Sequence, residues 1–151
     1  MRASLLKNSQ AAALCLALVA GGARAAPSCK HLSAGLLAFG SYDPLSSTPT
    51  DAASVIAYSC ANSLSVVVSL SGDGGGRSSP RTLKGPGGDT LVYDLFTSPS
   101  RDVVWGDGSG GTVTLPVDPN GRSVTFYGRI FALQSAAAGG YGDTIIVTFN
   151  Y

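Results

Sequence analysis

The chain has 151 residues, ten Lys and Arg, nine acidic residues that are all aspartate, and a formal net charge of +1 at pH 7. This balance lacks the clustered basic surface that nucleic-acid binding requires, and it is not acidic enough for a polyanionic tail. The length predicts one domain, large enough to bury about two-thirds of its unfolded surface.

Residues 1–25 have the pattern of a secretory signal peptide. Positive charge precedes a ten-residue apolar run at 11–20, and Ala23-Arg24-Ala25 offers a small-x-small cleavage site. The run is too short to cross a bilayer, so a membrane anchor is excluded. We expect cleavage after Ala25 and an exported domain of residues 26–151 without stable membrane insertion. Cleavage removes three basic residues, which leaves seven against nine aspartates and a net charge of about −2.

Cleavage also removes Cys15 and leaves Cys29 and Cys60. An even pair in an exported chain predicts one disulfide rather than a metal or redox site. Closing a loop of this length stabilises the fold by about 3 to 4 kcal/mol in the chain-entropy model. The bridge would connect the first strand of the mature chain to the strand that carries Ile56 and Tyr58.

Apolar residues alternate with other residues over 64–70, 91–96, 112–117 and 124–131, which predicts four strands. Pro116 places the third of them at a sheet edge or at a strand end. Glycine-rich turns separate these stretches, and Ala136-Ala137-Ala138 is too short for a helix. An antiparallel β-sandwich is the natural packing for such strands.

The last twelve residues predict a turn followed by a strand in which Ile145, Val147, Phe149 and Tyr151 share one face. Neither a polar tail nor a covering helix follows. We expect such a strand to obtain neighbours from elsewhere or to leave an apolar edge open to another chain. Assembly by strand exchange is therefore a hypothesis from the sequence alone.

Evidence for catalysis is weak, and we expect no enzyme, no cofactor and no metal. His31 is the only histidine, so a histidine-rich zinc site cannot form. Ser109 lies in a glycine-rich stretch that superficially resembles the nucleophile loop of trypsin-like proteases, and a small hydrolase remains a third hypothesis. Asp73 and Asp107 in glycine-rich loops leave a loop calcium site open.

A second hypothesis is a self-contained secreted binding module, for example for glycans. It would use Tyr42, Trp105 and Tyr141 as exposed rings that stack on sugars, although such rings are more often half-buried core.

The order of several short motifs resembles the spore coat protein U domain family, which includes subunits of archaic, Csu-type chaperone–usher pili. The motifs run from Phe39-Gly40 and Tyr42-Asp43-Pro44, through Ile56-x-Tyr58-x-Cys60, Arg81-Thr82-Leu83, Leu91-x-Tyr93-x-Leu95, Trp105-Gly106-Asp107-Gly108 and Tyr127-Gly128-Arg129-Ile130 with Gln134, to Gly140-Tyr141-x-Asp143-Thr144 and a terminal aromatic residue. The resemblance covers residues 29–151.

This resemblance implies an immunoglobulin-like sandwich that lacks its final strand. A periplasmic chaperone fills the open groove, an usher exports the subunit, and a neighbouring subunit then donates a strand by β-augmentation. The implied location is the periplasm in transit, then the cell surface in a pilus or coat. The residues expected to line or flank the groove are Val66, Val68, Ile145, Val147, Phe149 and Tyr151.

One departure from the family pattern concerns the donor segment. Only Ala26, Pro27 and Ser28 precede Cys29 once the signal peptide is removed. We therefore expect this chain to accept a strand without giving one, which suits a terminal position in a fibre or a coat protein.

Overall fold

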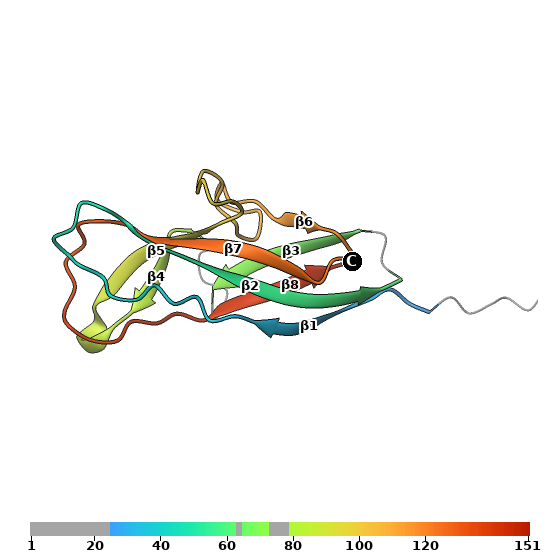
Figure 1. The fold of residues 1–151 in the computed structure, drawn as a ribbon, viewed down its shortest axis with the longest axis horizontal. Helices are drawn as coiled ribbons and strands as arrows, with labels where there is room; N and C mark the ends of the chain where they lie inside the picture. Colours follow the sequence, from blue (N-terminus) through green and yellow to red (C-terminus); the bar gives the residue numbers. More distant parts are fainter. Residues whose placement is uncertain (1–24, 63–64, 73–78) are drawn as a thin grey trace, which may run out of the picture.

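The computed structural model describes residues 25–62, 65–72 and 79–151, which form two antiparallel sheets around a shared core (Figure 1). The larger sheet has the order β1 (Ser28–Ala34), β2 (Thr50–Ala61), β7 (Ser123–Ile130), β5 (Thr90–Phe96) and β4 (Arg81–Lys84). The smaller sheet has the order β6 (Leu115–Val117), β3 (Val66–Gly72) and β8 (Ile145–Asn150). A 3₁₀ turn at Pro86–Gly88 separates β4 from β5, and no α-helix occurs in these residues. The predicted all-β, immunoglobulin-like sandwich is confirmed.

The strand phases follow the alternation of the sequence. In β3, the side chains of Val66, Val68 and Leu70 are at most 1% exposed, so this face forms one wall of the core. In β5, Leu91 and Tyr93 are buried in the same way. Alternation therefore located the inner face of each sheet correctly.

β6 is the shortest strand, with three residues, and it lies at the edge of the smaller sheet. Pro116 is its central residue and pairs with Val67 of β3. Proline has no backbone N–H to extend a sheet, so its position in an edge strand agrees with the prediction.

The disulfide between Cys29 and Cys60 is present and joins two residues that lie directly opposite each other in β1 and β2. Their Cα atoms are 4.1 Å apart. The bridge fixes β1, an edge strand of the larger sheet, to the long strand β2.

The connection from β7 to β8 is held against the larger sheet by polar contacts. The Gln134 side chain makes two hydrogen bonds with the backbone of Val92. Its Nε2 donates to the Val92 carbonyl at 2.8 Å, and its Oε1 accepts from the Val92 N–H at 2.6 Å. Tyr42 accepts from the Gln134 N–H at 2.7 Å and donates to the Phe131 carbonyl at 3.2 Å. Gly142 pairs with Lys84 at the outer edge of β4. This connection therefore has a defined path along β5 and β4 of the larger sheet.

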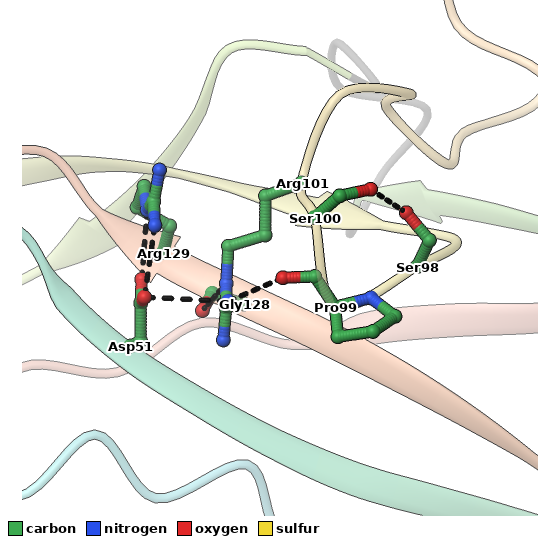
Figure 2. Close-up of polar contacts among 7 residues, drawn as sticks. All are labelled: Asp51, Ser98, Pro99, Ser100, Arg101, Gly128 and Arg129. Atoms are coloured by element: carbon green, nitrogen blue, oxygen red, sulfur yellow. Dashed lines mark hydrogen bonds and ion pairs between the residues drawn. The ribbon is translucent and has the colours of Figure 1, made fainter.

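An ion-pair cluster fastens the connection after β5 to the outer face of the larger sheet (Figure 2). Arg129 of β7 makes two contacts with the Asp51 carboxylate of β2, at 2.7 and 2.9 Å. Arg101 reaches the same carboxylate at 3.3 Å and lies over the Tyr127 ring. The hydrogen bond from Arg129 lowers the pKa of Asp51, and the charges of Arg101 and Arg129 add to this effect.

The expected signal peptide, apart from Ala25, lies outside the described residues, as does Asp73. Within residues 25–62, 65–72 and 79–151, no helix has the length and hydropathy needed to cross a membrane.

Candidate functional site

β8 has a neighbour on one side only within the part of the chain that the structure describes. It pairs antiparallel with β3, from Val67 opposite Asn150 to Gly72 opposite Ile145, and it ends the order of the smaller sheet. The inward-facing residues of β8 are half-buried, whereas those of β3 are fully buried. The second edge of β8 is thus an apolar strand edge with unused backbone groups.

A second extended segment faces the same space. After β1, the Gly35 N–H donates to the Val55 carbonyl at 2.8 Å, and residues 36–41 then make no backbone hydrogen bond with any other described residue. Leu37 and Phe39 of this segment pack against the core. They lie over Gly128 of β7, where a Cβ atom would come within 2.6 Å of Leu37 and 2.7 Å of Phe39. Gly128 therefore allows this segment to approach the larger sheet closely.

A groove of about 1050 Å³ lies between these two segments and opens onto the core. Its floor is formed by buried apolar residues of both sheets, namely Ile56, Leu70, Leu83, Leu91, Phe126 and Ile130. Protein interiors are close-packed and contain few voids larger than a water molecule. A groove of this size above the main core is therefore a place that another group is expected to fill.

One end of the groove is polar. The Tyr93 hydroxyl donates to the Asp143 carboxylate at 2.7 Å, and both residues line the groove. Burial raises the pKa of the Tyr93 hydroxyl, and its hydrogen bond to Asp143 raises it further. Tyr93 is therefore a neutral hydrogen-bond donor at every ordinary pH.

The residues expected to line or flank the groove are not all placed in it. Ile145 and Val147 line it, and Val68 lies opposite Phe149 in the β3–β8 register. Val66 and Val68 are buried in the core, and Phe149 packs against the Tyr58 ring at 5.6 Å between centroids. Tyr151 follows β8 and is 56% exposed. Assignment of these residues to strand binding remains a proposal.

Sequence reasoning missed the wall opposite β8. The groove is lined on that side by residues 34–42 and at its end by residues 136–144. Alternation of Leu37 and Phe39 was a signal for the first segment, but it is only two residues long. Asp143 appeared only within a family motif, and nothing local indicated that it faces the groove.

The glycan hypothesis is not supported by the positions of its aromatic residues, because it requires exposed rings. Trp105 is 0% exposed, and its indole N–H donates to the Val68 carbonyl at 2.9 Å. Tyr42 and Tyr141 are half-buried, with hydroxyl groups bonded to backbone atoms. Trp105 fills the space between the sheets, because that is the only place where so large a ring loses most contact with water.

The hydrolase hypothesis also finds no geometric support. The Ser109 hydroxyl donates to Asp107 at 2.6 Å in an exposed loop, which is a local turn contact. His31 lies on β1, opposite Tyr58. In the described ranges no group of three His, Cys, Asp or Glu side chains is arranged to hold a metal ion.

No curated protein matches this chain. One similar solved structure is the crystal structure of the CsuC–CsuE chaperone–tip adhesion subunit pre-assembly complex from the archaic chaperone–usher Csu pili of Acinetobacter baumannii. The TM-score is 0.54 at 22% identity, over 83% of this chain and 40% of that chain, so the two share a fold and this chain spans less than half of that one. The family model of the Spore Coat Protein U domain matches residues 14–148, and the chain therefore belongs to this family.

Proposed function

We propose that this chain is an exported, non-enzymatic structural subunit of the pilus or coat type, and that its groove takes up an extended segment of another polypeptide. The observation that carries this proposal is the edge of β8, which lacks a neighbour among the described residues and borders an apolar groove that reaches the core. Membership of the Spore Coat Protein U family and the similarity to a pilus subunit complex support it.

The physical basis is strand addition. An inserted segment would bond to the backbone of β8 on one side and to residues 36–41 on the other, while its alternate side chains enter the groove. Each apolar side chain that becomes fully buried contributes roughly 1.5 to 3 kcal/mol before the costs of association. Three or four such side chains would contribute roughly 5 to 12 kcal/mol, and the backbone hydrogen bonds to β8 would add to this.

The proposed partners follow the same logic. A periplasmic chaperone would supply the segment first, which protects the open edge during transit, and a neighbouring subunit would replace it after passage through an usher. The similar solved structure is a complex of a chaperone with a tip adhesion subunit. For this chain, a chaperone, an usher and a location in the periplasm and then at the cell surface are proposals.

We also propose that the chain accepts a strand without donating one. β1 begins at Ser28, so the residues from Ser28 onward are engaged in the chain's own larger sheet. If the signal peptide is cleaved after Ala25, only Ala26 and Pro27 are available ahead of β1. This favours a terminal position in a fibre or a coat protein, and N-terminal sequencing of the exported protein tests the cleavage site.

The test of the main proposal uses the exported chain and a synthetic peptide of alternating apolar and polar residues. We expect the exported protein alone to melt at a low temperature or to associate, and the peptide to raise its melting temperature in a concentration-dependent way. A peptide with the same composition but two central prolines is the control, because proline prevents continuous backbone pairing.

Co-expression with candidate periplasmic chaperones, followed by pull-down, extends this test to the proposed partner. The proposal is wrong if the exported protein alone is monomeric, highly heat-resistant and unchanged by the alternating peptide.

A further inference from the structure

The groove has one charged residue among the side chains that line it, Asp143, which lies two residues before β8 begins. Asp143, Ile145 and Val147 are alternate residues, and all three line the groove. Asp143 is exposed. Its hydrogen bond to Tyr93 of β5 and the pairing of the preceding Gly142 with Lys84 of β4 place its carboxylate at the end of the groove that borders β4 and β5.

The charge of Asp143 has hydrogen-bond partners but no counter-ion in the described residues. Its Oδ2 accepts from the Tyr93 hydroxyl at 2.7 Å and its Oδ1 accepts from the Thr144 N–H at 2.8 Å. No Lys or Arg forms an ion pair with it, since both ion pairs of this part of the chain involve Asp51. Arg81, opposite Tyr93 in the β4–β5 pairing, donates from Nη2 to the Leu70 carbonyl. Its charge opposes the rise that burial causes in the pKa of Tyr93 and of Asp94, without an ion pair to Asp143.

An inserted strand would cover this carboxylate and remove water from it. Covering a charge without supplying a partner is unfavourable, whereas a cation placed against it restores the lost solvation. The Tyr93 hydroxyl fixes one carboxylate oxygen, so the negative charge has a defined position at the end of the apolar row. Charge complementarity therefore selects the chemistry of the residue that arrives there.

We propose that the segment taken up by the groove carries a lysine or arginine at the position facing Asp143, next to the apolar residues that face Ile145 and Val147. This rests on the proposed function and adds a specificity and register determinant to it. A strand shifted by two residues would place an apolar side chain against the carboxylate and leave its own cation in the apolar part of the groove. Such a shift is unfavourable on both counts.

The experiment measures binding of matched peptides to the exported chain by the rise in melting temperature and by titration. The peptides share an alternating apolar core and differ at one terminal position, which is Lys, Gln or Glu. Each terminal residue is tested at either end, so that both parallel and antiparallel insertion beside β8 are covered. We expect the Lys peptide to bind about three- to tenfold more tightly than the Gln peptide in one of the two placements, and the Glu peptide to bind most weakly.

The variant Asp143→Asn is expected to abolish the preference for Lys over Gln while it keeps binding of the apolar core. Asp118→Asn is the matched control, since Asp118 bonds the Asn120 N–H in a different loop and does not line the groove. It should keep the full preference. Tyr93→Phe retains the carboxylate and should keep a preference for Lys, which separates the charge of Asp143 from its hydrogen bond to Tyr93. The preference of the wild-type chain should also shrink in 0.5 M salt.

The outcomes distinguish this inference from the proposed function. If Lys and Gln peptides bind the wild-type chain equally in both placements, or if Asp143→Asn keeps the preference, the inference is overturned and strand uptake stands. If no alternating apolar peptide binds at all, strand uptake fails and the inference fails with it.

Discussion

The two edge strands of the smaller sheet, β6 and β8, differ in length, in proline content and in whether another described segment covers them. On the β6 side, the strand has three residues with a central proline, and residues 105–106 continue the pairing where β6 ends. Trp105 donates its backbone N–H to Leu95 of the larger sheet, and the Leu70 N–H of β3 donates to Gly106. On the β8 side, a six-residue apolar strand without proline has no such cover among the described residues.

This difference shows what each edge is suited to do. Short edge strands and prolines are devices that prevent pairing with other chains, and the β6 side has both. β8 has neither device, and its inward residues are as apolar as those of β3. The protein's own chain therefore closes one side of the sandwich, and the other side retains the features of a pairing site.

The largest expected effect concerns the closed side. Trp105→Ala removes a fully buried ring and leaves the Val68 carbonyl without its donor, so we expect a loss of about 3 to 5 kcal/mol in the free energy of unfolding. Urea unfolding with the alternating peptide bound measures this value. Trp105→Phe keeps most of the volume and should cost less. An unchanged unfolding midpoint for Trp105→Ala would mean that the closed side does not depend on this ring.

The segment that forms the wall of the groove opposite β8 comes directly after β1 in the chain, and the disulfide holds β1 to β2. Replacing Cys29 and Cys60 by serine should lower the free energy of unfolding by about 3 to 4 kcal/mol, because the unfolded chain regains the freedom of a 31-residue separation. Reduction of the wild-type chain should give the same urea midpoint as the double variant. A large difference between the urea midpoints of the reduced wild type and the double variant would show that the serines change stability in some way other than by loss of the disulfide.

A matched pair of isoleucines compares the core with the open edge directly. Ile56→Ala, at a site that is 1% exposed, should cost about 2 to 5 kcal/mol whether or not a peptide is bound. Ile145→Ala, at a half-buried site in β8, should cost less than about 1 kcal/mol in the free chain and should weaken peptide binding. Equal costs of the two changes in the free chain would contradict the view that β8 lacks cover.

The smallest effect is expected on the larger sheet, at the Asp51 cluster of Figure 2. Asp51→Asn should cost at most about 1 kcal/mol at pH 7, because the carboxylate is partly exposed. The pKa of Asp51 is lowered from its ordinary value of 3.8, so its stabilisation is present above that pH and is lost as the pH falls through the lower folded value. Urea unfolding from pH 7 to pH 2 should show the two chains converging only at the acidic end.

Local sequence patterns predicted the parts of the fold that depend on local periodicity. The alternation in Val66, Val68 and Leu70 gave the inner face of β3, and the two cysteines of the predicted mature chain gave the disulfide. β4 was not predicted as a strand, because four residues with two buried side chains carry too little periodicity. Only the glycan hypothesis required Trp105 at the surface, and the glycine-rich context of this residue does not reveal that it is buried in the core.

The sequence by itself determined most of the strands, the apolar face of strands such as β3 and β5, and the cysteine pair. Strand faces repeat over a few neighbouring residues, and the disulfide follows from the number of cysteines. Only the tertiary structure decided that β8 pairs with β3 and with no other described strand, that residues 36–41 stand opposite it and that Asp143 lies at the end of the space between them. The physical reason is that the neighbours of a strand are chosen by long-range packing of whole sheets. No local period in the chain encodes that choice.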